Sequence, residues 1–136
     1  MHFPYKVTVP HSTPQTAPYE KILQLGPGII TAIRFFFPAG HAGTAHCVLL
    51  FNEFQAWPSS RGEDYHGDDN EVPIMERFDM ESGPYQVKFR GWNTDTVNDH
   101  AIQVHIEVLK AEQLGLSPGA VTLSDLQRMI GTQLQV

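Results

Sequence analysis

The residues best suited to chemistry in this chain are two histidines in the stretch PAGHAGTAH, residues 38–46. His41 and His46 lie within and just after a small-residue loop that joins two apolar runs. Imidazole nitrogens are common ligands of zinc and other transition metals, so the loop is a candidate metal site. The alternative is a tight turn between two buried strands, in which proline ends one strand and the glycines adopt sharp backbone angles.

Part of this stretch resembles the opening of the first metal-binding motif of cupin barrels. Gly40 and His46 have its G-x5-H spacing, but the motif continues with a second histidine two residues later, where Val48 stands. Glu53 follows near the end of the expected strand, and nothing like a second ligand motif comes after it. A metal needs several imidazole and carboxylate ligands to fill its coordination shell. The tight turn is therefore the favoured interpretation.

A different arrangement pairs His46 with His100 and adds Asp95 or Asp99. Both histidines stand at the start of expected strands that follow polar loops. Two imidazoles and a carboxylate would suit a transition metal. However, Asn and Asp are also abundant in turns, because their side chains hydrogen-bond to the nearby backbone. We therefore favour a strand connection for WNTDTVNDH, with His100 as an orienting hydrogen-bonding group.

Aromatic side chains near the loops offer a second kind of site. Trp57, Trp92, Tyr65 and Tyr85 could stack on sugar rings while Asp95 reads hydroxyl groups, as in carbohydrate-binding β-sandwich modules. Loop tryptophans of a sandwich more often close the end of the core.

The segment 62–71, GEDYHGDDNE, holds five acidic side chains but lacks the ligand spacing of a calcium loop. It is either a solvated acidic loop or a contact for a basic partner.

Nucleophilic and phosphate-binding motifs are absent from the sequence. It contains no G-x-S-x-G, no Walker loop and no G-x-G-x-x-G. The single cysteine, Cys47, lies in the apolar run CVLLF, which favours a buried and inert thiol. Glu76 and Asp79 are acidic side chains of a kind common on any sandwich surface. We therefore predict a non-enzymatic protein and assign no catalytic, cofactor-binding or metal-ligating residue.

Composition agrees with one globular domain. The 136 residues are 41% hydrophobic and 18% charged, with 9 basic against 15 acidic side chains. An acidic chain without a basic run is not expected to bind nucleic acid. The N-terminal residues do not have the pattern of a signal peptide, and no apolar run approaches the ~20 residues of a membrane span. We expect a soluble protein without a membrane partner.

The elements that position these residues are predicted to be β-strands. Alternation with a period of two is clear in residues 85–90 and 101–109, and residues 29–37 and 44–51 are apolar on both faces. Further strands are expected at 6–9, 19–25 and 72–80. The polar loops 57–71, 81–84 and 91–99 separate these runs. The pattern predicts an all-β protein, an antiparallel β-sandwich of about eight strands with jelly-roll-like connections.

The two ends differ from this middle. Residues 1–18 hold four prolines and are interpreted as an N-terminal arm that either wraps its own domain or reaches a neighbour. Residues 19–110 are the predicted sandwich domain. Residues 111–136 form a tail in which Leu123, Leu126, Met129 and Ile130 make an apolar stripe at helical spacing, so a short C-terminal helix is predicted there.

Residues 28–109 resemble a small jelly-roll class of virion structural proteins of tailed phages and related viruses. The resemblance depends on FFFPAGHAGTAH, on a WP pair followed by an acidic stretch, and on YQVKFRGWNTDTVNDHAIQVHIEV. It implies no catalytic residues. It implies a capsid decoration, cement or fibre-associated subunit that binds and stabilises the shell.

The partners so implied are the protein itself, as a homo-oligomer with a trimer favoured, and the major capsid protein or other virion proteins. The location would be the virion, after synthesis in the host cytoplasm. Strands that are apolar on both faces independently suit a chain that packs against neighbours.

Overall fold

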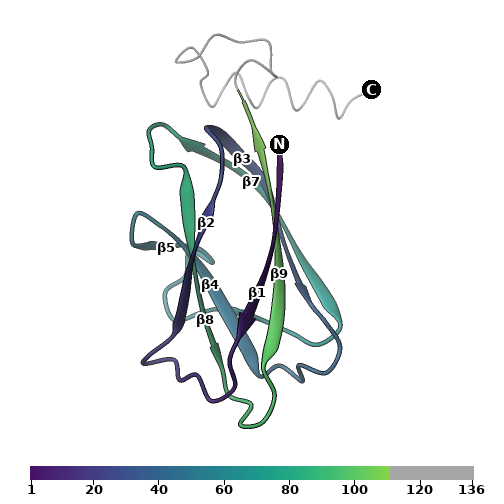
Figure 1. The fold of residues 1–136 in the computed structure, drawn as a ribbon. Helices are drawn as coiled ribbons and strands as arrows, with labels where there is room; N and C mark the ends of the chain where they lie inside the picture. Colours follow the sequence, from purple (N-terminus) through teal and green to yellow (C-terminus); the bar gives the residue numbers. More distant parts are fainter. Residues whose placement is uncertain (111–136) are drawn as a thin grey trace.

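The protein is all-β in residues 1–110, the part of the chain that the computed structural model describes. The predicted C-terminal helix and the rest of the tail, residues 111–136, lie outside the described residues. Nine strands form two antiparallel sheets, and Figure 1 follows them along the chain. They are β1 (His2–Val9), β2 (Tyr19–Gln24), β3 (Gly28–Phe37), β4 (Ala45–Phe51), β5 (Phe54–Trp57), β6 (Tyr65–His66), β7 (Asn70–Met80), β8 (Gln86–Asn93) and β9 (His100–Leu109).

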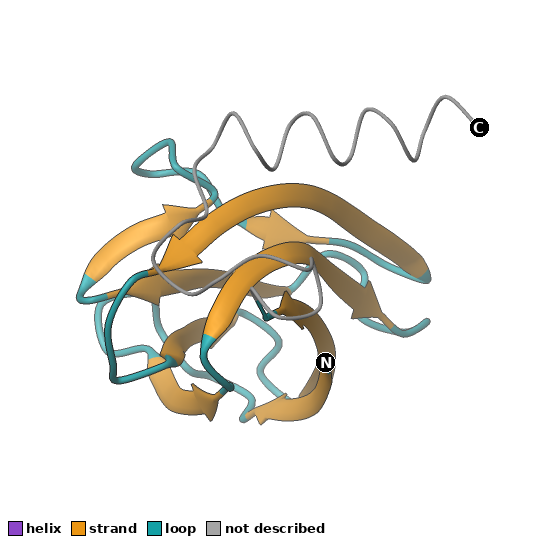
Figure 2. Ribbon diagram, turned by 90° about the horizontal axis from the view of Figure 1, so that it is seen from above, coloured by secondary structure: helices purple, strands orange, loops and turns teal. Residues whose placement is uncertain are grey.

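Non-consecutive strands are neighbours in both sheets. The first sheet has the order β1-β9-β3-β7, and the second has the order β2-β8-β4-β5, with β6 pairing to the other half of the same edge of β4. Every pairing is antiparallel. Seen from above, the strands lie in two layers (Figure 2). The ends of distant segments therefore meet at the same end of the molecule.

The core lies between the two layers because each strand turns every second side chain inward. On β9 the residues Ile102, Val104, Ile106 and Val108 are buried, and they alternate with less buried ones. Side chains from both sheets join them in one apolar cluster, which includes Phe35 and Phe89. Burial of this apolar surface is the main force that holds the sheets together.

Seven of these strands correspond to segments that the sequence predicted. β5 and β6 were not predicted, since they fall at the edge of and inside the long polar stretch 57–71. β1 is longer than the predicted strand 6–9 and pairs with β9 along its whole length. Residues 2–9 of the arm thus pack on their own domain. Within residues 1–110 there is no helix long and apolar enough to cross a membrane.

Gly91 shows how closely the second sheet is packed. It lies on the core face of β8, opposite Cys47 of β4. A Cβ atom added at Gly91 would lie 2.6 Å from Cε1 of Phe89 and 3.1 Å from the carbonyl oxygen of His46. The first distance is too short for a real side chain and the second is tighter than most, so a larger residue would displace Phe89 or press on the backbone of β4.

Candidate functional site

The outer face of the second sheet carries the residues of most functional interest. Strand register places opposite residues on the same face, so three cross-strand rows can be read from the pairings. One row runs from Ile22 through Lys88 to Leu50, and the next from Glu20 through Arg90 to Val48. The last row holds Trp92 of β8, His46 of β4 and His66 of β6. The surface of these rows is called the outer face below.

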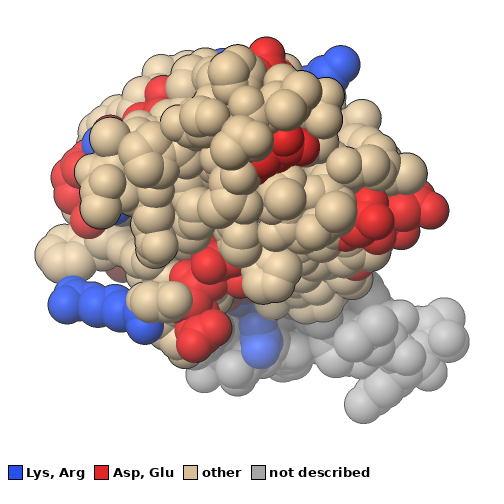
Figure 3. Space-filling model, turned by 90° about the horizontal axis from the view of Figure 1, so that it is seen from below, with Lys and Arg blue, Asp and Glu red and all other residues tan. Residues whose placement is uncertain are grey.

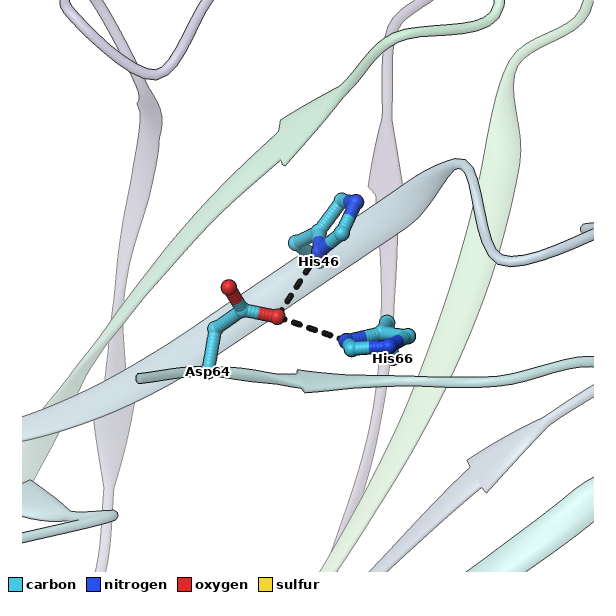
Figure 4. Close-up of side chains that lie close together, drawn as sticks. All are labelled: His46, Asp64 and His66. Carbon is cyan, nitrogen blue, oxygen red and sulfur yellow. Dashed lines mark hydrogen bonds and ion pairs between the residues drawn. The ribbon is translucent and has the colours of Figure 1, made fainter. Parts of the chain in front are cut away.

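The last row brings two imidazoles to one carboxylate. His46 Nδ1–H donates to Asp64 Oδ1 at 2.7 Å, and His66 Nδ1–H donates to the same oxygen at 2.8 Å. Figure 4 shows both rings turned toward the carboxylate, with His46 on β4 and Asp64 just before β6. Asp64 and His66 are two residues apart in an extended segment, so they share a face. One donor atom from each of the three residues lies within 4.8 Å of the others.

Trp92 holds the His46 ring in place. The indole and imidazole rings are stacked almost parallel, with an interplanar angle of 4° and centroids 5.5 Å apart. Trp92 is itself buried with Val48 and Leu50 in a small apolar cluster, separate from the main core. The opposite side of the group is open, because the His66 side chain is 54% exposed while those of His46 and Asp64 are 20% and 17% exposed. The cluster is therefore firmly supported below and accessible from solvent.

A second histidine–aspartate cluster occupies the same end of the molecule. His100 Nε2 bonds to Asp95 Oδ2 at 2.9 Å, and the His41 ring lies 4.5 Å from the His100 ring. Asp95 also accepts hydrogen bonds from the backbone N–H groups of Val97 and Asn98. These backbone bonds come first among the reasons why the pKa of Asp95 is well below its usual range, with the bond from His100 after them.

His41 is the most enclosed of these imidazoles. It is 3% exposed, and its Nδ1 atom has no hydrogen-bond partner. Burial lowers the pKa of His41, and the neighbouring His100 lowers it further, while the backbone of Ala101 and the charge of Asp68 oppose the shift. The ring is therefore held in its neutral form across a wider pH range than a solvated histidine.

The alternative pairing of His46 with His100, which was not the favoured interpretation of the sequence, is not found. His100 lies with His41 and Asp95, whereas His46 lies with Asp64 and His66. Among residues 1–110, the group around Asp64 is the one set of three His, Cys, Asp or Glu side chains whose donor atoms converge closely enough for a metal ion. Asp64 and His66 were missed because they lie in a segment interpreted as an acidic loop. Their alternate spacing, D-Y-H, was the available signal.

The cupin-like ligand set is not found either. His46 lies on the outer face, and Val48 occupies the next cross-strand row on that same face. Glu53 lies in the turn after β4 and pairs with Lys88. That carboxylate therefore serves an ion pair on the sheet surface rather than the histidine cluster.

Both tryptophans are buried, so neither offers a free ring to a sugar. Trp57 is 3% exposed, and its Nε1–H donates to Glu76 Oε2 at 2.8 Å. Trp92 is covered by the imidazole of His46. Tyr65 packs on Phe35 with ring centroids 4.6 Å apart, and burial raises the pKa of its hydroxyl to about 12. Trp57 and Tyr65 pack on the main core and Trp92 lies under His46 on the outer face, so these rings do not form a stacking platform.

The structure also shows the surroundings of Cys47 and of the acidic segment 62–71. Cys47 is buried, and burial raises the pKa of its thiol well above the usual value, which suits an unreactive side chain. The acidic stretch contributes Asp68, which accepts a hydrogen bond from the backbone N–H of Gly40 in the opposite loop. Seen from below, this end of the molecule shows more acidic than basic surface (Figure 3).

Comparison with known proteins adds no family: no family model matches this chain, and no curated protein matches it.

Proposed function

We propose that the chain is a non-enzymatic virion structural protein with a jelly-roll fold, a decoration, cement or fibre-associated subunit that self-associates and binds the shell. The sequence resemblance in residues 28–109 is the first support. It names the partners as further copies of the chain, with a trimer favoured, and the major capsid protein or another virion protein.

The order of the strands supports the jelly-roll part of the proposal. When β5 and β6 are counted together as one strand beside β4, each sheet has four members. Strands β1 and β2 then lie in opposite sheets, and each pairs with a strand from the end of the chain, β9 or β8. Eight strands in two such sheets are the arrangement of jelly rolls, a fold that viral capsid domains use.

The observation that carries the functional proposal is the apolar character of β4 on both faces. Its core-facing residues join the main core, while Val48 and Leu50, each 3% exposed, form with Trp92 a separate buried cluster on the outer face. Beside them Ile22 is exposed, and it lines with Leu50 and Lys88 a depression of about 310 Å³. A strand that is apolar on both faces suits a sheet that packs against another chain.

Association through this surface is tested by adding a charge to it. Ile22→Glu should leave the fold intact, because the side chain is exposed on the edge strand β2. Light scattering is expected to show oligomers of the unchanged protein and mostly monomers of this variant. Binding to assembled capsid shells, measured by co-sedimentation, is expected to fall with it, since repulsion and desolvation oppose burial of a charge.

Met75→Glu is the matched control. Met75 is the most exposed large apolar side chain among residues 1–110, and it lies on β7 of the other sheet. This variant should associate and bind shells like the unchanged protein. A chain that stays monomeric at high concentration and does not bind capsid lattices would refute the proposed function.

A further inference from the structure

We infer that His46, Asp64 and His66 form a binding site for one divalent transition-metal ion of the zinc type. This inference goes beyond the proposed structural role and does not depend on it. It follows from the donor atoms, their geometry and the support around them.

The donor atoms suit such an ion. Two imidazoles and one carboxylate are ligands that zinc and its neighbours in the first transition series accept, whereas calcium and magnesium prefer oxygen ligands alone. The group contains no second carboxylate that would favour a hard cation. The two nitrogen donors therefore favour a zinc-type ion over calcium or magnesium.

The distances are close to those of a coordination shell. Ligand atoms about 2.0–2.2 Å from a tetrahedral ion are separated from one another by about 3.3 Å. The Nδ1 atoms of His46 and His66 now lie 2.7 and 2.8 Å from Asp64 Oδ1. The donor atoms of the three residues all lie within 4.8 Å of one another. Small side-chain rotations that widen the two short contacts by roughly half an ångström and draw the more distant donors together would admit the ion.

Binding also requires the correct imidazole tautomers. Each ring now presents an Nδ1–H to Asp64, because the carboxylate only accepts hydrogen bonds. An ion bound at Nδ1 would take the place of these two protons, and neutral rings would carry them on Nε2 instead. No proton needs to leave the two rings, and the bound cation would replace their N–H groups as the partner of the carboxylate.

The surroundings favour a defined and open site. Trp92 stacks on His46 and fixes one ligand, and the pairing of β6 with β4 fixes the segment that carries the other two. The exposed His66 ring leaves the solvent side accessible. Three protein ligands would therefore leave at least one coordination position for water or for an oxygen or nitrogen ligand of another molecule. Bound metal would also tie β6 and its flanking loops to β4.

The test is calorimetric titration of the full chain with Zn²⁺ at about pH 7.5, where histidine rings are mostly neutral. We expect one ion per chain with a dissociation constant below about 100 µM. His66→Ala and Asp64→Asn should each weaken binding at least tenfold, which is typical for lost metal-site interactions. Both side chains lie near the surface, and urea unfolding of each variant will confirm that it folds.

His105→Ala is the matched control. His105 bonds to His2 in another histidine pair, on the first sheet, so its loss should leave the dissociation constant unchanged. Absence of binding by the unchanged protein would overturn the inference. Binding that is equal in His66→Ala, or that is weakened more by His105→Ala, would place the ion elsewhere and overturn it too. The self-association measured for the proposed function is a separate readout, so the two ideas fail independently.

Discussion

The cluster around Asp95 and the cluster around Asp64 contain the same residue types at the same end of the molecule, but their carboxylates have different partners. Asp95 accepts two backbone N–H groups in addition to His100. Within residues 1–110, the hydrogen bonds to the Asp64 carboxylate come from the His46 and His66 rings. The hydrogen bonds of Asp95 thus stabilise the loop before β9.

Exposure separates the two clusters further. His100 and His41 are buried against each other, while the His66 side chain is more than half exposed. A buried cluster with backbone partners stabilises a fold, because each lost bond leaves an unsatisfied polar group. An exposed cluster whose hydrogen bonds within residues 1–110 join its own members can exchange those bonds for a ligand. Residue type alone therefore does not distinguish a structural group from a binding group.

The largest difference between the clusters is expected in stability. His100→Ala should lower the free energy of unfolding by roughly 2 kcal/mol, because it removes packing against His41 and a bond to Asp95. His66→Ala should change it by less than about 0.5 kcal/mol, as is usual at exposed positions. Urea unfolding in the presence of a chelator measures both. Equal losses in the two variants would contradict the distinction between a structural and an open cluster.

The pH dependence of the free energy of unfolding tests whether the buried cluster holds His41 in its neutral form. Its pKa is lowered by burial, so the folded protein binds fewer protons than the unfolded chain once the pH falls below about 6.5. This contribution to stability is complete above that pH and is lost as the pH decreases. We expect His41→Phe to show a weaker fall of the free energy of unfolding between about pH 7 and 5.

His105→Ala measures how much of the pH dependence of stability comes from a histidine other than His41. The pKa of His105 is lowered as well, first by burial and then by the charge of His2, so part of the slope belongs to this residue. A second decrease is expected in more acidic solution, where Asp95 in the unfolded chain is protonated before Asp95 in the folded protein. Identical pH slopes for His41→Phe and the unchanged protein would show that His41 is not held neutral.

A further small effect is expected at Asp64. Asp64→Asn keeps the shape and one oxygen acceptor, so we expect a change in the free energy of unfolding of less than about 1 kcal/mol without metal. With saturating Zn²⁺ the unchanged protein should gain thermal stability and the variant should not. Thermal unfolding with and without metal measures this, and an equal gain in both proteins would count against Asp64 as a ligand.

The sequence was informative about the strands because alternation with a period of two is a local signal. Residues 101–109 alternate clearly, and the structure has β9 over almost the same range. β5 was hidden because its hairpin turn is Asn52-Glu53, both with positive φ, rather than a turn with glycine. β6 was hidden because two residues are too few for a periodic signal.

The candidate site was harder to predict because it depends on pairing between distant segments. His46 was singled out from the start, but nothing local shows that residues 65–66 pair with β4. The alternative partner considered for it, His100, has the right residue type and lies at the same end, yet its strand belongs to the other sheet. Register and sheet order, which come from the whole fold, decide which histidines meet.

The most direct test of the difference between the two clusters is a crystal of the protein grown with Zn²⁺ and measured at the zinc absorption edge. An anomalous peak is expected between His46, Asp64 and His66, about 2.0–2.2 Å from one atom of each residue. No peak is expected beside His41, His100 and Asp95. A crystal with no peak at the first group, or with its peak at the second, would contradict the account.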